Sequence, residues 1–151
     1  MRQAWRIVKE KHAATAFTGE GAARTGGRWN SRGNRVVYAS STTSLAALEN
    51  LVHLNPPILF SYVAFRIRFD PALLEKIAHP WPADWREQPP PPSTMAIGDR
   101  WVREARSAVL EVPSVIIPGE VNYLLNPAHP DFPKILIRKA APFAFDPRLL
   151  V

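Results

Sequence analysis

The chain has 151 residues, 46% of them hydrophobic, and its 19 Lys and Arg exceed its 13 Asp and Glu, which leaves a formal net charge of +6. This length suits one domain, residues 1–151, and the positive charge indicates an anionic partner. The absence of cysteine excludes disulfides and thiolate metal sites, and because no apolar run approaches the ~20 residues of a membrane span we expect a cytoplasmic protein.

The first third of the chain is predicted to contain two strands and a helix. Residues 5–8 alternate between apolar and polar side chains, and residues 35–40 are β-branched and aromatic, so both segments are predicted strands. Residues 18–34 between them hold turn-forming residues and are predicted to be a loop. A helix is predicted over 40–54, because hydroxyl residues that can cap it precede good helix formers and Pro56-Pro57 follows.

The middle of the chain is predicted to form a strand, a short helix and a long loop. Residues 61–69 alternate clearly, with apolar side chains at every second position. Asp70 and Pro71 look like an N-cap followed by a first-turn proline, which predicts a helix over 72–78. Residues 79–93 are rich in proline, so this segment is expected to be a rigid surface loop.

The last third is predicted to be mostly strands. A helix over 94–105 comes first. Strands are predicted at 108–112, 114–117 and 134–140, followed by a short strand and turn over 143–150. Because strands dominate and helices are few, the sequence predicts an α+β fold with a mostly antiparallel sheet.

Glu49 borders the apolar face of the helix predicted over 40–54. Leu45, Leu48 and Val52 form the apolar stripe, and Glu49 lies beside it rather than opposite it. A carboxylate there costs free energy unless it is paired. Two interpretations stay open: an edge residue bonded to a nearby arginine, or a functional carboxylate in a cleft between the strand 35–40 and its helix.

The stretch GGRWNSRG, residues 26–33, surrounds a large cation and a large ring with glycines. Gly26 and Gly27 allow turns and a close approach of the backbone to a ligand. Arg28 carries a planar fork of donors that suits a pyrophosphate or a carboxylate, and Trp29 can pack beneath it. The alternative is a tight turn whose arginine pairs with an internal acid.

Other polar residues are individually weak signals. Arg6 lies on the strand face opposite Trp5, where it is either solvated or lines a cleft. A tyrosine such as Tyr38, on the strand before the helix, is more often a core residue than a platform for a ligand. Ser114 and Asn122 stand among apolar residues, where turn or cap duty is the usual role. The four histidines form no HExxH or H-x-E pattern, so no metal site is expected, and no GxSxG motif occurs that would support an α/β-hydrolase.

Four blocks occur in order along the chain: GEGAARTGGRWNSRG, VVYAS, LAALENLVH and VPSVIIPGEVNYLLNPAHPDF. Together they resemble the RES domain family, the toxin half of bacterial RES–Xre toxin–antitoxin modules. The resemblance implies an ADP-ribosyltransferase-like α+β fold, with a mostly antiparallel split sheet and a few short helices. It also implies an activity, the destruction of cellular NAD.

The resemblance also assigns roles to individual residues. It implies a catalytic glutamate, arginine and tyrosine, and substrate-binding residues that include one serine. The implied catalytic residues are Glu49, Arg6 and Tyr38. The implied substrate-binding residues are Arg28, Trp29 and Ser114, with Ser40 as the rival for the family serine.

The implied chemistry is cleavage of the nicotinamide–ribose bond through an oxocarbenium-like state. Glu49 would stabilise the developing charge and orient the 2′-OH, two arginines would hold the pyrophosphate, and Tyr38 would stack on the nicotinamide ring or the ribose. NAD is then the substrate, and no cofactor is expected. The acceptor stays open: water in a glycohydrolase, phosphate in a phosphorylase, or a protein side chain in an ADP-ribosyltransferase.

The expected partner is a cognate Xre-type antitoxin that covers the active site. It would carry the DNA-binding domain, so direct contact with nucleic acid is not expected, nor with a membrane. The competing interpretation is a basic nucleic-acid-binding module, because Arg66 and Arg68 on one strand face resemble a stripe of phosphate contacts. Against it, no RNP, OB or helix-turn-helix pattern occurs.

Overall fold

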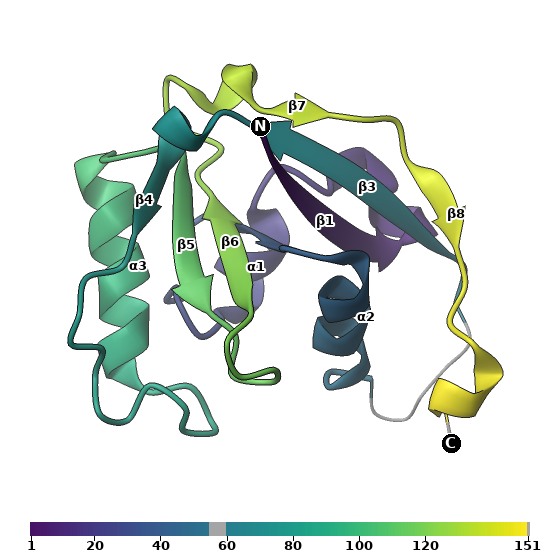
Figure 1. Ribbon diagram of the computed structural model, residues 1–151, viewed down its shortest axis with the longest axis horizontal. Coiled ribbons are helices and arrows are strands. Elements are labelled where there is room, and N and C mark those ends of the chain that lie inside the picture. Colours follow the sequence, from purple (N-terminus) through teal and green to yellow (C-terminus); the bar gives the residue numbers. More distant parts are fainter. Residues whose placement is uncertain (55–59, 151) are drawn as a thin grey trace.

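The computed structural model describes residues 1–54 and 60–150, and its strands form one sheet (Figure 1). The strands are β1 (Arg2–Lys9), β2 (Val37–Ser40), β3 (Tyr62–Phe69), β4 (Leu74–Lys76), β5 (Val109–Pro113), β6 (Val121–Leu125), β7 (Leu136–Ile137) and β8 (Ala141–Phe143). Their order is β4-β5-β6-β2-β1-β3-β7, and β8 also pairs with β3. The pair β4–β5 is parallel and the other pairs are antiparallel, which confirms the predicted mostly antiparallel α+β fold.

Helices are few. They are α1 (Glu20–Thr25), α2 (Thr43–Leu51) and α3 (Pro92–Glu104), with 3-10 turns at Glu10–Thr15, Pro71–Leu73, Phe132–Lys134 and Pro147–Leu150. Thr42 caps α2, since its hydroxyl accepts a hydrogen bond of 3.0 Å from the amide of Leu45. The helix ends at Leu51, and the proline pair predicted to stop it, Pro56-Pro57, lies outside the described residues.

The sheet is split between β1 and β2. The strands β1 and β3 pair from end to end, whereas β1 meets β2 at the pair Trp5–Ser40. On the far side of the split, Ser40 pairs with Asn122 of β6. Because paired residues project from the same face of a sheet, the side chains of Trp5, Ser40 and Asn122 share one face. Helix α2 packs on that face through Ala46, which contacts Ile7.

The face that carries Ser40 and Asn122 is also covered by α3 and by the loop after α1. Trp101 of α3 and Trp29 of the loop pack together with Leu110 and Leu124 of the sheet. The loop and helix approach closely, because a Cβ at Gly98 would lie 1.7 Å from the carbonyl oxygen of Trp29. A glycine at this position is what allows the loop with Trp29 to rest on α3.

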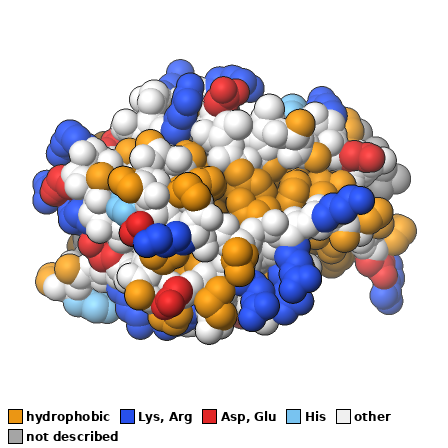
Figure 2. Space-filling model, turned by 90° about the horizontal axis from the view of Figure 1, so that it is seen from above, with side chains coloured by type: hydrophobic (Ala, Val, Ile, Leu, Met, Phe, Trp, Pro, Cys, Tyr) orange, Lys and Arg blue, Asp and Glu red, His pale blue; other side chains and the backbone are white. Residues whose placement is uncertain are grey.

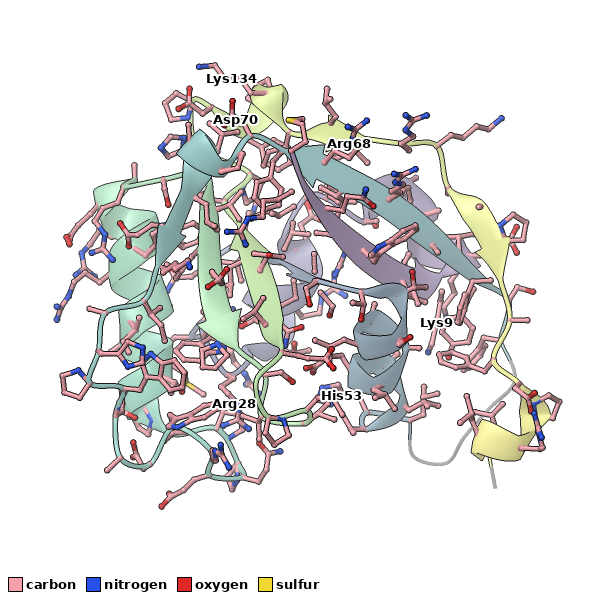
Figure 3. The ribbon with its side chains drawn as sticks, viewed as in Figure 1. Lys9, Arg28, His53, Arg68, Asp70 and Lys134 are labelled. Carbon is pink, nitrogen blue, oxygen red and sulfur yellow. The ribbon has the colours of Figure 1, made fainter. Side chains whose placement is uncertain are left out.

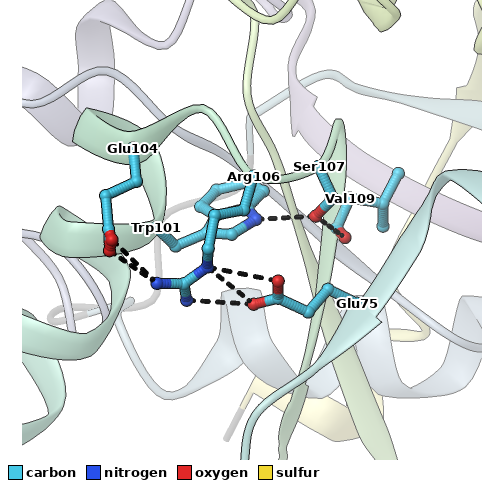
Figure 4. A network of polar contacts seen from close by, with 6 residues as sticks. All are labelled: Glu75, Trp101, Glu104, Arg106, Ser107 and Val109. Carbon is cyan, nitrogen blue, oxygen red and sulfur yellow. Dashed lines mark hydrogen bonds and ion pairs between the residues drawn. The ribbon is translucent and has the colours of Figure 1, made fainter.

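Polar contacts tie α3 to the parallel edge of the sheet (Figure 4). The indole N–H of Trp101 donates to the Ser107 hydroxyl at 2.7 Å. Arg106 forms ion pairs with Glu75 of β4 at 2.9 Å and with Glu104 at the end of α3 at 3.0 Å. Such half-exposed pairs contribute little individually, but they orient the helix relative to β4.

Two predicted elements are wrong. Residues 72–78 are not a helix: Asp70 caps a single 3-10 turn, since its carboxylate accepts from the amide of Ala72, and the chain then enters β4. Pairing of β4 with β5 overrides the helical preference of these residues. Residues 114–117 are not a strand, because the chain turns at Ser114. The strand of this region is β6, Val121–Leu125, which was not predicted.

Other predicted elements exist with different bounds. The predicted loop 18–34 contains the short helix α1. Of the predicted strand 134–140, only Leu136–Ile137 forms a strand, β7. The last strand, β8, covers Ala141–Phe143 and so lies before most of the strand and turn predicted over 143–150. The remaining predicted strands and helices of the described chain correspond to β1, β2, α2, β3, α3 and β5.

The surplus positive charge is not confined to one stripe on the face seen from above. Figure 2 shows Lys and Arg side chains distributed around an apolar area on that face. Figure 3 places Arg68 at the opposite end of the molecule from Arg28. Within residues 1–54 and 60–150, no helix combines the length and apolar character needed to cross a membrane.

Candidate active site

The carboxylate of Glu49 lies between α2 and the carboxyl end of β5. Its Oε1 accepts a hydrogen bond of 2.7 Å from the amide Nδ2 of Asn122 and one of 3.3 Å from the hydroxyl of Ser114. The Asn122 amide is oriented by Ser40, whose hydroxyl donates to Asn122 Oδ1 at 2.7 Å. One oxygen of Glu49 is thus held by two donors, and Oε2 has no hydrogen-bond partner within residues 1–54 and 60–150.

Both predicted serines belong to this network, at different distances from the carboxylate. The Ser114 oxygen accepts from the amides of Ile116 and Ile117 at 3.1 and 3.2 Å. Because these two bonds occupy its lone pairs, its proton is free to be donated to Glu49. Ser40 reaches the carboxylate only through Asn122. The direct contact favours Ser114 as the serine that acts on Glu49.

Arg28 is anchored to the loop between β4 and α3 (Figure 3). Its Nη1 donates to the carbonyls of Trp85 and Glu87 at 2.9 and 2.8 Å, and its Nη2 donates to Gln88 Oε1. Three of the five N–H donors of the guanidinium are thus engaged. The Nε–H and one Nη2–H have no partner in the described part of the chain, so two donors remain for an oxyanion.

Electrostatics couple Arg28 to the carboxylate. Burial lowers the pKa of Arg28, while the nearby Glu49 and Tyr38 act in the opposite direction by favouring its charged form. The guanidinium remains a cation at neutral pH, since a perturbed arginine still titrates far above it. The site therefore combines an acid and a cation that influence each other electrostatically.

Tyr38 holds the Arg28 loop in place. Its hydroxyl donates to Asn30 Oδ1 at 2.7 Å and accepts from the backbone amide of Trp29 at 3.0 Å. Burial raises the pKa of Tyr38, so the phenol stays neutral. The close approach requires Gly27, where a Cβ would lie 2.8 Å from the Tyr38 hydroxyl. With both hydrogen bonds made inside the protein, this hydroxyl acts as a positioning group for Arg28.

Two predicted site residues are placed away from the site. Trp29 is 2% exposed and packs in the core with Trp101, so its side chain supports the loop and is not available to substrate. Arg6 follows Trp5 on β1 and therefore projects from the sheet face opposite Ser40 and Asn122. This placement does not bring Arg6 next to Glu49, and its predicted contact with the pyrophosphate stays a prediction.

Arg6 has a structural role at the split in the sheet. Its Nε donates to the carbonyl of Ala16 and its Nη1 to the carbonyl of Tyr38, both at 2.8 Å. These bonds satisfy backbone groups near the split, where β1 and β2 separate. Burial of this guanidinium lowers the pKa of Arg6 to about 10.

We expect Arg6→Met to destabilise the fold. The methionine keeps the length of the side chain but leaves the carbonyls of Ala16 and Tyr38 without their donors. The free energy of unfolding, measured in urea, should fall by about 2 kcal/mol or more. Arg32→Met, at an exposed loop position, should change it by less than about 0.5 kcal/mol. An equal loss in both variants would contradict the structural role of Arg6.

Two asparagines, the partly buried Asn122 and the fully buried Asn30, complete the site and were not predicted as site residues. Asn122 orients Glu49, and its signal in the sequence was that it stands among apolar residues. Asn30 is fully buried, and besides Tyr38 it bonds three backbone carbonyls of the loop, those of Ala22, Ser31 and Asn34. No sequence pattern of the loop distinguishes Asn30 from an ordinary turn asparagine. In the described ranges, no group of three or more His, Asp or Glu side chains is placed to hold a metal ion.

Comparison with known proteins agrees with this fold and shows the family of the chain. The RES domain family model matches residues 3–146. A Toxin Res of Yersinia enterocolitica is 40% identical, covering 96% of this chain and 97% of its own length. A Prs ADP-ribosylating toxin of Sphingobium sp. is 39% identical, covering 97% of this chain and 95% of its own length.

A solved structure shares the fold at low sequence identity. The crystal structure of the M. tuberculosis MbcT–MbcA toxin–antitoxin complex contains a chain with a TM-score of 0.73 and 16% identity. The match covers 95% of this chain and 84% of that one. The split, mostly antiparallel sheet and the few helices define an α+β domain with the fold seen in that complex. Within that class, the chain belongs to the RES domain family.

Proposed function

We propose that this RES-family toxin cleaves the bond between nicotinamide and ribose in NAD. The observation that carries the proposal is the Glu49 carboxylate, with one oxygen held by Ser114 and Asn122 and the other without a partner in the described chain. A carboxylate fixed in this way can act on a sugar whose C1′ becomes positively charged. The free fork of Arg28 adds a site for a pyrophosphate.

The proposed reaction separates charge along one bond. The electron pair of the C1′–N bond leaves with nicotinamide, which departs neutral, and the ribose becomes oxocarbenium-like. Glu49 stabilises this cation electrostatically and accepts a hydrogen bond from the 2′-OH. With water as the acceptor, the oxygen bonds to C1′ and one proton is released, giving ADP-ribose. NAD is the substrate, and we propose no separate cofactor.

A protein side chain is the second candidate acceptor. It is favoured by one relative, since the Sphingobium protein that is 39% identical is an ADP-ribosylating toxin. Inorganic phosphate is the third, and it would give ADP-ribose 1″-phosphate. All three acceptors share the same first bond cleavage, so the assignments of Glu49 and Arg28 do not depend on which one is used.

We further propose that an antitoxin covers this site. The MbcT–MbcA structure, whose toxin chain shares this fold, is a toxin–antitoxin complex. The formal charge of +6 favours an acidic partner surface. An Xre-type antitoxin, which the family resemblance implies, would then bind DNA itself.

The direct test is incubation of the purified chain with NAD, with nicotinamide measured by chromatography. Reactions with and without phosphate, and with a bacterial lysate, should release nicotinamide in at least one condition. The second product identifies the acceptor: ADP-ribose, its 1″-phosphate, or a mass increase on a lysate protein. No release of nicotinamide in any of the three conditions would overturn the proposal.

The two serines should differ in their effect on nicotinamide release. Ser114→Ala removes a direct donor to Glu49, so we expect kcat to fall about tenfold. Ser40→Ala leaves the bond from Asn122 to Glu49 in place, so we expect a fall of about threefold or less. Steady-state kinetics on the two variants measure this order. A larger loss in Ser40→Ala would identify Ser40 as the family serine instead.

A further inference from the structure

The sheet face that carries the Glu49 site continues beyond it, across the next strands. Ser40 pairs with Asn122 of β6 on one side and with Trp5 of β1 on the other. Trp5 in turn pairs with Arg66 of β3. Because paired residues project from the same face, these side chains form one row across β6, β2, β1 and β3. With neighbouring strands roughly 4.8 Å apart, Arg66 lies about 14 Å from Asn122 along this row.

Three arginines, Arg66, Arg68 and Arg138, gather at the far end of this row and are called the arginine cluster below. Arg68 lies on the same face of β3 as Arg66, about 7 Å further along the strand. The amide of Arg138, just after β7, donates to the carbonyl of Arg66 at 2.9 Å, which places the two residues opposite each other. Like charges that face each other across two strands are destabilising by themselves. Leu136 of β7 pairs with Arg68 within the cluster, and it is 53% exposed.

The charge of the arginine cluster is not balanced inside the protein. None of the ion pairs within residues 1–54 and 60–150 involves these three arginines. The Nε atoms of Arg66 and Arg68 are out of contact with solvent and have no acceptor among the same residues. The guanidinium of Arg66 lies 6.0 Å from the ring of Trp5, which brings no net negative charge to it. The face therefore offers three cations to an anionic partner, and none of them has to leave an internal ion pair first.

Leu136 indicates which kind of anion this face suits. A phosphate backbone finds no partner in an exposed leucine, and covering the leucine with phosphates would cost free energy of desolvation. A protein segment that carries acidic and apolar side chains can pair its carboxylates with the arginines and bury the leucine. Arginine and tryptophan, which both occur here, are also enriched at the energetically important centres of protein interfaces. The observations thus favour a protein segment over a nucleic acid.

We infer that this face docks the protein that receives ADP-ribose, through an acidic segment with apolar side chains. The inference rests on the proposed function, with a protein side chain as the acceptor. In the transfer, the nucleophilic atom of the acceptor bonds to C1′ as nicotinamide leaves, and it releases its proton to solvent.

The position of the arginine cluster fits the docking of an acceptor. A transferase must hold its acceptor while NAD occupies the catalytic groups, so the docking surface has to lie apart from Glu49 and Arg28. The cluster shares the sheet face of Asn122, the partner of Glu49, yet stands three strands away from it. A partner that only blocked the site would have to lie over Glu49 and Arg28 themselves.

The first test separates transfer to protein from cleavage of NAD. The chain is incubated with biotin-labelled NAD and a bacterial lysate, and the label on protein is measured; nicotinamide release is measured without lysate. Arg66→Gln combined with Arg68→Gln should lower the label on protein about tenfold and leave nicotinamide release within about twofold. Arg66→Lys combined with Arg68→Lys keeps both charges and should restore part of the loss. Arg138→Gln, at an exposed position after β7, should give a smaller loss of label and serves if the double variant folds poorly.

The matched control is Arg100→Gln combined with Arg103→Gln. It removes the same charge from exposed positions of α3, which lies at the β4 edge of the sheet, far from β7 (Figure 1). Label on protein and nicotinamide release should both stay within about twofold of the wild type.

The second test measures docking with defined peptides. A fluorescent peptide of alternating Glu and Leu is titrated with the full chain, and its anisotropy gives Kd. It should bind about tenfold more tightly than a peptide of alternating Glu and Ser, and Leu136→Ser should remove that difference. The Glu–Leu peptide should also inhibit labelling of lysate proteins and leave nicotinamide release unchanged. A single-stranded oligonucleotide of equal charge is the competing ligand.

The outcomes distinguish this inference from the proposed function. If the wild type releases nicotinamide but labels no protein, or if both double glutamine variants lose label equally, the docking inference is overturned and the cleavage of NAD stands. Tighter binding of the oligonucleotide than of the Glu–Leu peptide would also overturn it. If the wild type releases no nicotinamide in any condition, the proposed function fails. A selective loss of peptide binding in the Arg66 and Arg68 variant then still supports docking of an acidic protein on this face.

Discussion

Glu49→Gln is expected to reduce nicotinamide release about 1,000-fold or more, in line with the loss of a preorganised charge at a cationic transition state. Glutamine has the size of glutamate, and its Oε1 can still accept from Asn122 and Ser114. The fold should therefore be preserved, and what is lost is the negative charge beside C1′. The effect should fall on kcat, because the charge is needed mainly when the ribose becomes positive.

The control for this variant is Glu104→Gln, which removes a carboxylate from the end of another helix, where it pairs with Arg106. Its kcat should stay within about twofold of the wild type, as for surface changes in general. Both variants should give the same circular dichroism spectrum as the wild type. If Glu49→Gln keeps its kcat with a normal fold, Glu49 is not the catalytic carboxylate and the proposed mechanism is wrong.

The sequence predicted the helix that carries Glu49, because the features that define this helix lie close together along the chain. Helical periodicity placed this carboxylate beside a predicted apolar stripe, of which Leu45 is buried and Val52 is exposed. The hydroxyl run before it predicted the cap that Thr42 provides. Both features are set within a few residues of the chain. The partners of Glu49 were not predictable in the same way, since Ser114 and Asn122 are 65 and 73 positions away.

Arg6 shows where sequence interpretation fails. Alternation along β1 correctly separates Arg6 from Trp5, but only the pairing of Trp5 with Ser40 tells which face carries the site. That pairing is set by the order of strands in the sheet. The order of strands also explains why the predicted helix over 72–78 is wrong. Residues 74–76 of this segment form β4 because β5 lies beside them and pairs with them. Trp29 is a third case: its neighbour Arg28 points outward, while the ring is fixed in the core by Trp101.

Arg28→Lys should separate recognition of the pyrophosphate from the bond cleavage itself. Lysine keeps the positive charge but loses the planar fork, and it cannot make the three contacts to the loop of Trp85, Glu87 and Gln88 together with two to a ligand. We expect kcat/KM for NAD to fall about 100-fold. Nicotinamide riboside has the same scissile bond and no pyrophosphate, so its slower cleavage should change by less than about threefold.

Arg32→Lys is the matched control, because Arg32 lies in the same loop at an exposed position. Its kcat/KM for NAD should remain within about twofold of the wild type. An equal loss of activity toward NAD and nicotinamide riboside in Arg28→Lys would mean that this arginine acts at the ribose or the leaving group. A selective loss for NAD ties the arginine to the phosphates and leaves bond cleavage at the nicotinamide ribose to Glu49.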